Sequence, residues 1–242
     1  MSGILDRRLE LLNQRYEDTG PLSIISAITE EEFDPSKVAL VSSFGTESAV
    51  LLHMVSRIRP DLPILFLDTG KLFGETKRYR DQLIKLLGLT DVRSITPDPE
   101  RIKAFDAKGV LWSQDPTACC QIRKVEPLAR AVAQFDAWFT GRKAFQAATR
   151  AKLPVLELAN GKFKINPIVG WGKADIDAYF ERYALPRHPL EADGYLSIGC
   201  MPCTSRVEAG EDARAGRWRG SDKVECGIHV PGRQVPAVAA EA

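Results

Sequence analysis

The stretch KVALVSSFGTES (Lys37–Ser48), together with PILFLDTG (Pro63–Gly70), decides the fold of this chain. Each stretch begins with an apolar run of strand length and ends in small or polar residues. Between them, apolar residues recur at helical spacing from Val50 to Ile58 and stop before Pro60. Nearly all-apolar strands that alternate with helices are typical of a parallel sheet covered on both faces.

The same alternation extends along the chain on both sides of these two stretches. Upstream, we predict a helix over residues 5–16 and a second helix that begins at Pro21. Downstream, we predict helices over 75–87, 100–108, 119–134 and 175–183, strands over 91–96 and 136–140, and a hairpin turn at Asn160-Gly161. The sequence therefore predicts an α/β fold, a parallel twisted sheet with helices on both faces.

Regular patterning stops near the C-terminus, where Gly, Arg, Glu and Asp dominate from Arg206 onward. We expect residues 1–205 to form one α/β domain. Residues 206–233 should form a mobile segment, and residues 234–242 a disordered tail.

Charge and composition exclude several classes of function. Lys and Arg number 33 against 32 Asp and Glu, so we expect neither nucleic acid nor an anionic membrane as a partner. The N-terminus carries charges throughout, and no run of about 18 apolar residues occurs that could span a membrane. We expect a cytoplasmic protein. Its five cysteines then indicate metal ligands or nucleophiles rather than disulfides.

Two loops follow the first two strands and are candidates for binding a nucleotide. Small residues and a helix N-terminus suit an anion, and the carboxyl ends of parallel strands are where open α/β sheets bind ligands. An ordinary strand-to-helix turn with serine caps is the alternative for the first loop. The candidate residues are Ser42, Ser43, Phe44, Gly45, Thr46 and Glu47 in the first loop, and Asp68, Thr69 and Gly70 in the second.

Four cysteines form the strongest motif, because Cys119 and Cys120 are adjacent and Cys200 and Cys203 form a C-x-x-C pair. Four thiolates satisfy a four-iron, four-sulfur cluster or a tetrahedral zinc ion. A vicinal pair forms an unstrained disulfide poorly, so ligating a metal is its more sensible use. Iron is the preferred metal, and zinc stays the alternative.

The fifth cysteine, Cys226, lies in the polar segment ECGIH with Lys223 and His229 near it in sequence. A thiol in such surroundings is a candidate nucleophile, and a neutral surface cysteine is the alternative. Just upstream, Arg214, Arg217 and Trp218 belong to the segment RAGRWR, in which three arginines suit an anion. A solvated basic stretch is the alternative for that segment.

Taken in series, these motifs resemble the assimilatory sulfonucleotide reductases, specifically the branch of adenylyl-sulfate reductases that carries an iron–sulfur cluster. The resemblance runs from about Val38 to His229. Its motifs are SSFGTES (Ser42–Ser48), LDTGKLF (Leu67–Phe73), CCQIRKVEPL (Cys119–Leu128), GYLSIGCMPC (Gly194–Cys203), GEDARAGRW (Gly210–Trp218) and ECGIH (Glu225–His229).

The resemblance implies an adenine nucleotide alpha-hydrolase-like fold of the PP-loop type, in which the first two loops hold the nucleotide. It implies that Cys119, Cys120, Cys200 and Cys203 ligate a [4Fe-4S] cluster. It also implies a set of single roles: Lys124 links cluster and substrate, Arg214, Arg217 and His229 contact the phosphosulfate, Trp218 is the aromatic residue of the tail, and Cys226 is the nucleophile.

One loop departs from the family pattern. Relatives often carry two basic residues followed by Gln-Ser after the fourth strand, whereas TGRKAFQAATRA (Thr140–Ala151) lacks the serine. It keeps Arg142, Lys143 and Arg150, and we expect Arg142 and Lys143 to belong to the nucleotide site.

The resemblance implies reduction of adenosine 5′-phosphosulfate to sulfite and AMP through an S-sulfocysteine at Cys226. With a single cysteine outside the ligand set, the chain needs an external dithiol such as thioredoxin or a glutaredoxin-like protein. We also expect a homo-oligomer. The alternatives are a reductase for phosphoadenylyl sulfate or for both substrates, a tRNA thiolase of the ATP pyrophosphatase type, and a non-enzymatic cluster sensor.

Overall fold

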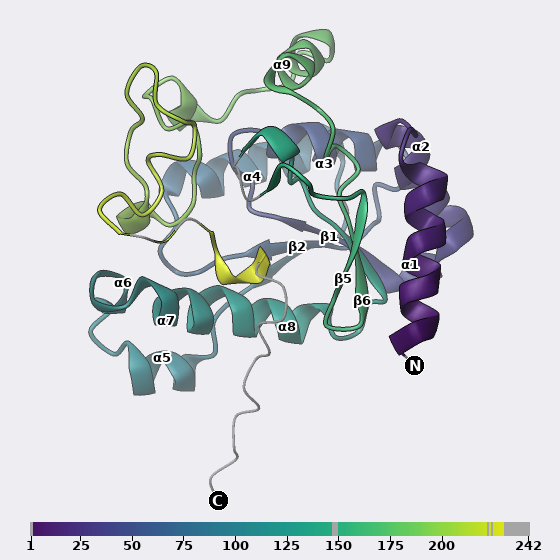
Figure 1. The fold of residues 1–242 in the computed structure, drawn as a ribbon. Coiled ribbons are helices and arrows are strands. Elements are labelled where there is room, and N and C mark those ends of the chain that lie inside the picture. Colours follow the sequence, from purple (N-terminus) through teal and green to yellow (C-terminus); the bar gives the residue numbers. More distant parts are fainter. Residues whose placement is uncertain (1, 147–149, 222, 224, 230–242) are drawn as a thin grey trace, which may run out of the picture.

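The computed structural model describes residues 2–146, 150–221, 223 and 225–229. A six-stranded sheet lies at its centre, in the order β3-β2-β1-β4-β6-β5 (Figure 1). The strands are β1 (Val38–Ser42), β2 (Ile64–Leu67), β3 (Val92–Ile95), β4 (Ala137–Phe139), β5 (Leu156–Ala159) and β6 (Lys162–Ile165).

Strand pairing follows the predicted parallel pattern except at one edge. β1 pairs in parallel with β2 and β4, and β3 and β6 extend the sheet in parallel on either side. β5 runs antiparallel to β6 as a hairpin. Its turn residues Asn160 and Gly161 have φ values of 53° and 74°, the left-handed conformation that a tight two-residue hairpin turn requires. The predicted hairpin is confirmed.

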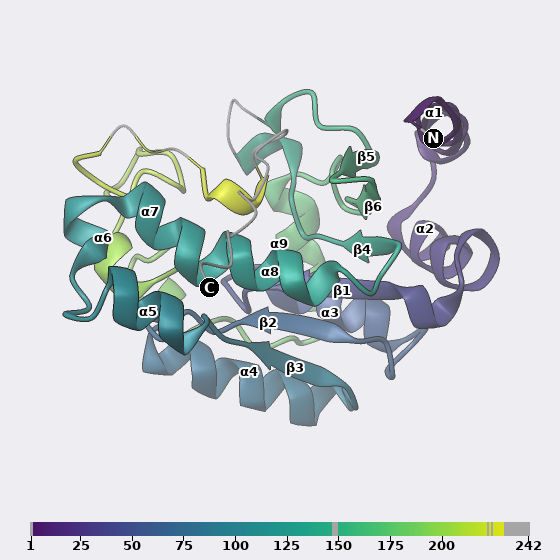
Figure 2. The same ribbon diagram turned by 90° about the horizontal axis from the view of Figure 1, so that it is seen from below.

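Helices cover both faces of the sheet. α3 (Ser48–Ser56) and α4 (Gly74–Leu87) lie on one face, and the stretch from α5 to α8 lies on the other (Figures 1 and 2). The remaining bounds are α1 (Ser2–Tyr16), α2 (Pro21–Ala27), α5 (Pro99–Phe105), α6 (Leu111–Gln114), α7 (Pro116–Cys120), α8 (Glu126–Val132) and α9 (Lys173–Arg182). Two segments are π-helical, η1 (Ile28–Glu32) and η3 (Gln121–Val125), and η3 lies between α7 and α8. The 3₁₀ turns are η2 (Pro35–Lys37), η4 (Ala144–Gln146), η6 (Pro189–Glu191), η7 (Met201–Cys203) and η8 (Gly227–His229).

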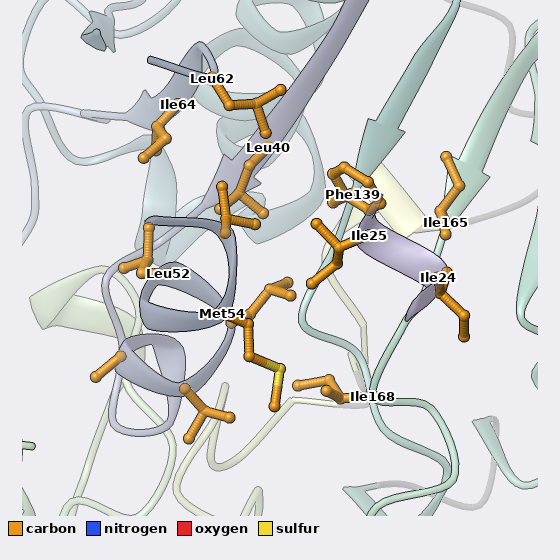
Figure 3. Close-up of a cluster of buried hydrophobic side chains, with 14 of the residues drawn as sticks. Ile24, Ile25, Leu40, Leu52, Met54, Leu62, Ile64, Phe139, Ile165 and Ile168 are labelled. Atoms are coloured by element: carbon orange, nitrogen blue, oxygen red, sulfur yellow. The ribbon is translucent and has the colours of Figure 1, made fainter. Parts of the chain in front are cut away.

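Alternating side chains of the central strands pack on opposite faces of the sheet. Leu40 and Ile64 join the larger core with Leu52 and Met54 of α3 (Figure 3). Ala39 belongs to a smaller core on the opposite face. Each fully buried aliphatic side chain contributes about 1.5–3 kcal/mol, so this alternation fixes which helices face which side.

The predicted elements are present, with differences at their ends. The helix predicted to reach residue 108 stops at Phe105, because the chain turns so that Asp106 can bind Arg123 and accept the backbone N–H of Leu111. The helix predicted from residue 119 begins at Pro116, where Asp115 accepts two backbone N–H groups as an N-cap. None of the helices formed by the described residues has the length and apolar character that a membrane crossing requires.

Residues 206–221 fold back onto the cysteine-bearing segment before them. The backbone N–H of Ser205 donates to Gly216 at 2.8 Å, and that of Trp218 donates to Cys203 at 3.1 Å. A Cβ at position 216 would lie 2.2 Å from the Ser205 oxygen, so glycine is required there. Lys223 then reaches Thr117 of α7 at 3.1 Å. The mobility of residues 206–233 stays a prediction, and residues 230–242 lie outside the described part.

His188 provides a test of stability as a function of pH. Its ring is 1% exposed; Nδ1 accepts the Leu190 N–H, which leaves Nε2 to donate to Thr76 at 3.1 Å. Burial lowers the pKa of His188 to about 4, below the value of about 6.5 in an unfolded chain. The neutral ring therefore stabilises the fold above pH 6.5, and this contribution is lost as the pH falls towards 4.

We predict that His188→Asn, which keeps an acceptor for Leu190, flattens the pH dependence of unfolding. Between pH 7 and 4 the wild-type chain should lose up to about 3 kcal/mol more than the variant. Urea unfolding at several pH values measures the difference. Parallel curves for the two proteins would contradict the assignment.

Candidate functional site

A cavity of about 230 Å³ lies over the carboxyl ends of the central strands. Ser42 at the end of β1, Leu67 at the end of β2 and Thr140 after β4 all line it. The chain passes from β1 to β2 on one side and later returns to β4 on the other. Ligands bind open α/β sheets at this kind of switch point.

The loop between β1 and α3 supplies one wall of the cavity. Five of its six predicted residues line the cavity, namely Ser42, Ser43, Gly45, Thr46 and Glu47, and their contact with a nucleotide stays a prediction. Phe44 does not line the cavity, because its φ of 49° turns the ring into the core, where it meets Phe66 edge-on at 5.3 Å. The ring anchors the loop instead.

In the second predicted loop, one of the three candidate residues lines the cavity and the other two do not. Thr69 lines the cavity, and its hydroxyl lies 3.1 Å from the Cys200 sulfur. Asp68 and Gly70 are absent from the lining. The Asp68 carboxylate accepts the Gly70 N–H and pairs with Lys77 at 2.8 Å. A contact between Asp68 and a nucleotide stays a prediction.

The four cysteines predicted as ligands come from two segments that face each other. Cys119 and Cys120 end α7, and Cys200 and Cys203 flank the first residues of η7. All are free thiols; three are buried and Cys203 is half-buried. Burial raises the pKa of Cys119 to about 11, and the nearby Cys200 and Cys203 thiols add to the rise.

This donor set fits a thiolate-bound metal group. Buried thiols with raised pKa values are costly to ionise, and a bound metal removes that cost by stabilising the thiolates. In the part of the chain that the structure describes, no three His, Cys, Asp or Glu side chains are placed to hold one metal ion. The sulfurs therefore do not converge on a single-ion position, although they share one buried region.

Lys124 and Arg217 form the cationic side of the cavity next to these sulfurs. Burial opposes the charge of Lys124, but Cys226, Cys200 and Cys120 together raise its pKa above the ordinary value. The Arg217 guanidinium lies over the Trp218 ring at 4.5 Å. A Cβ on Gly199 would lie 2.2 Å from that guanidinium, so glycine at 199 makes room for it. Sequence reasoning missed Gly199, although it directly precedes a cysteine of the motif.

The other predicted cations each have a carboxylate partner. Lys143 pairs with Glu47 at 2.9 Å, and Arg142 pairs with Glu157, which Lys164 also contacts. Burial, with help from Arg142 and Arg150, lowers the pKa of Lys164 to about 7. Glu47 was a candidate from the sequence, but Glu157 and Lys164 were missed, because nothing in the pattern of one segment shows which distant residue it will meet.

Arg150 and Arg214 both bind Glu225, the residue before Cys226. Arg150 donates two hydrogen bonds to the carboxylate in a bidentate contact, at 2.7 and 3.0 Å, and Arg214 donates a third at 3.2 Å. The side chains of Arg150 and Glu225 are 7% and 13% exposed. Burial lowers the pKa of Arg214 to about 10, against the opposite effect of Glu225. A partly buried ion pair thus ties the C-terminal segment to the loop after β4.

Cys226 lies in the cavity wall, packed with Cys120 and Trp218 and 8% exposed. A hydrogen bond from the Cys120 thiol, together with the Lys124 ammonium and Arg217, holds the pKa of Cys226 well below its ordinary value. A lowered pKa favours the thiolate, which is the nucleophilic form of a cysteine. Lys124 and Arg217 favour it also where Cys120 is bound to a metal and has no proton to donate. Figure 1 shows η8, which follows Cys226, next to the α7–α8 stretch. The backbone of His229 belongs to η8, but its side chain lies outside the described part.

Comparison with known proteins identifies the family. Residues 37–206 match the phosphoadenosine phosphosulfate reductase domain. An adenosine 5′-phosphosulfate reductase of Mesorhizobium japonicum is 51% identical over 224 residues, 93% of this chain and 88% of the relative. A phosphoadenosine 5′-phosphosulfate reductase of Gloeobacter violaceus is 37% identical and covers 94% of this chain and 96% of its own.

A solved structure shares the fold. The phosphoadenylyl-sulfate reductase of Candida auris, in a phosphate complex, superposes with a TM-score of 0.66 at 27% identity. The match covers 82% of this chain and 96% of that chain. The predicted fold class is confirmed by this likeness and by the parallel sheet.

We predict that Arg150→Gln makes the Cys226 sulfur more accessible, because it weakens the ion pair with the neighbouring Glu225. The lost charge-assisted hydrogen bonds contribute about 1.5–3 kcal/mol, but the contact of Arg214 with Glu225 remains. We therefore expect iodoacetamide to label Cys226 about five to ten times faster in the variant than in the wild-type chain. Peptide mapping by mass spectrometry measures the rate. Arg78→Gln, which removes a pair with Glu75 on the exposed face of α4, is the matched control. Equal labelling of the two variants would show that the ion pair does not shield the sulfur.

Proposed function

This chain belongs to the phosphoadenosine phosphosulfate reductase family, and on that premise we propose that it reduces adenosine 5′-phosphosulfate to sulfite and AMP. The observation that carries the proposal is the position of Cys226. It is the cysteine outside the set of four, and it faces the same cavity as the loop after β1 and the cations Lys124 and Arg217.

The cavity divides into a nucleotide end and an anion end. At the nucleotide end, Ser43, Gly45 and Thr46 precede the N-terminus of α3, whose dipole favours phosphate. At the anion end, Lys124, Arg214 and Arg217 offer positive charge to the sulfate group. An anionic nucleophile that attacks an anionic substrate needs this compensation.

The first step is attack of the Cys226 thiolate on the sulfur of the substrate. A bond forms between the Cys226 sulfur and the sulfate sulfur, and the bond from that sulfur to the phosphate oxygen breaks. AMP leaves with the bonding electron pair, and Cys226 becomes an S-sulfocysteine. No electron has yet come from outside the two reactants.

The second step needs a dithiol reductant. One thiolate of the dithiol attacks the Cys226 sulfur, and sulfite leaves. The second thiol then resolves the mixed disulfide, which frees Cys226 and oxidises the dithiol by two electrons. The four other cysteines fit a metal group and are not available to replace it. Thioredoxin is the proposed donor, a glutaredoxin-like protein is the alternative, and the cytoplasm, which keeps such dithiols reduced, is the proposed compartment.

We also propose a [4Fe-4S] cluster held by Cys119, Cys120, Cys200 and Cys203. Four buried or half-buried free thiols from two facing segments support it. When bound, the cluster supplies a fixed electrostatic centre beside the anion end of the cavity. Cys120 contacts Cys226, so the nucleophile lies next to a proposed ligand. A homo-oligomer stays a prediction.

Phosphoadenylyl sulfate is the second candidate substrate, since relatives with that name share the fold. It carries one more phosphate and needs more positive charge. In this chain Arg142, Lys143 and Arg150 are each paired with a carboxylate. The paired state of these cations favours the substrate without the additional phosphate.

We predict that adding adenosine 5′-phosphosulfate without a dithiol increases the intact mass of the chain by one SO₃ group. Cys226→Ser should show no adduct and no sulfite release, because the serine hydroxyl is a far weaker nucleophile at neutral pH. Intact and peptide mass spectrometry measure both. Sustained sulfite release by Cys226→Ser would refute the proposal and leave a cluster sensor or another enzyme class.

The metal is tested separately. Protein purified without oxygen should contain iron and acid-labile sulfide. It should also have an absorption band in the blue part of the visible spectrum. Cys200→Ser should lose both, whereas Cys226→Ser should keep them, because Cys226 lies outside the proposed ligand set. Metal analysis and absorbance measure the outcome. Zinc without sulfide would contradict the cluster but leave the role of Cys226 intact.

A further inference from the structure

Gln146 lies between the nucleotide loop and the C-terminal segment and bonds towards both. Its side-chain Nε2 donates to the Glu47 carboxylate at 2.9 Å. Its Oε1 accepts from Arg150 Nη1 at 2.7 Å. Glu47 lines the cavity in the loop after β1, and Arg150 holds Glu225, the neighbour of Cys226. A continuous chain of hydrogen bonds therefore joins the nucleotide loop to Glu225, the residue before the nucleophile.

The chemistry of this position calls for an amide. A guanidinium offers only donors and a carboxylate only acceptors, so the residue between them must accept on one side and donate on the other. This requirement also fixes which way the Gln146 amide points. A carboxylate at this position would accept from Arg150 but repel Glu47, and an aliphatic side chain would bind neither.

The local backbone holds Gln146 in place. It ends the short helix η4 (Ala144–Gln146), and the Lys143 N–H donates to its Oε1 at 3.3 Å. Lys143 also pairs with Glu47 at 2.9 Å, which holds that carboxylate beside Gln146. Both ends of the chain of bonds are thus charged, and charge-assisted hydrogen bonds are the stronger kind.

We propose that Gln146 is a positioning residue that sets the Cys226 sulfur relative to the bound nucleotide. It fixes Arg150 against the nucleotide loop, and Arg150 in turn fixes Glu225 and the adjacent Cys226. The inference rests on the proposed function, because it concerns the attack of Cys226 on the nucleotide sulfur. It assigns Gln146 no contact with the reacting atoms.

The test uses the full-length protein and separates the two steps. A displacement of about 1 Å between nucleophile and target costs up to about 100-fold in rate, so Gln146→Leu should slow S-sulfocysteine formation in a single turnover by about 10- to 100-fold. Release of sulfite from the preformed S-sulfocysteine by dithiothreitol should not slow. AMP binding should change by less than about threefold, because the pair of Lys143 and Glu47 remains.

Two further variants separate positioning from structural damage. Gln146→Glu keeps the acceptor for Arg150 but repels Glu47, so it should slow the first step as much as Gln146→Leu. Gln134→Leu makes the same chemical change at an exposed glutamine whose amide has only a weak local contact at 3.5 Å, and it should leave every step unchanged. Thermal unfolding of all three variants should match the wild-type chain within a few degrees.

The outcomes distinguish this inference from the function on which it rests. If the wild-type chain forms no S-sulfocysteine with adenosine 5′-phosphosulfate, the proposed function fails. If the wild-type chain forms it and Gln146→Leu forms it equally fast, the positioning role is refuted and the function stands. A normal rate in Gln146→Glu would limit the role of Gln146 to holding Arg150, and would refute the link to the nucleotide loop.

Discussion

Lys124 sets the electrostatic balance of the site, because its ammonium faces the sulfurs of Cys226, Cys200 and Cys120 together. A buried thiolate without a cation would take up a proton and lose its reactivity. A buried ammonium without nearby anions would in turn release its proton and become neutral. Lys124 and Cys226 therefore favour each other's charged form, and the nucleophile depends on η3 and the C-terminal segment meeting at one place.

The remaining cations that line the cavity also lie next to opposite charges. Arg142, Lys143 and Arg150 are buried, and each has a carboxylate partner from a different segment. Removing one partner of such a pair leaves an uncompensated buried charge, which costs more than the pair itself contributes. The pairs therefore specify one arrangement of the loop after β4, the hairpin and the C-terminal segment around the cavity.

The sequence predicted what depends on local patterns and missed what depends on distant pairs. The strands, the hairpin at Asn160-Gly161 and the loops at the strand ends follow from periodicity and turn chemistry. The direction of a side chain does not, so Phe44 was expected in the site and lies in the core. The pair of Arg150 and Glu225 was also missed, because 75 positions separate the two residues and no pattern in either segment indicates that they come together.

The contacts that hold Cys226 suit a segment that must release it. In the proposed reaction the sulfur meets the nucleotide in the cavity and then a dithiol protein too large to enter it. The tail is held by the Glu225 ion pairs, a Lys223 bond to Thr117 and the packed ring of Trp218. Detachment would expose both charges of the Glu225 ion pairs to water, and their hydration compensates part of the lost attraction, whereas exposing a large apolar core has no such compensation. A polar attachment around one indole therefore agrees with the predicted mobility of residues 206–233, and it still positions the sulfur in the cavity.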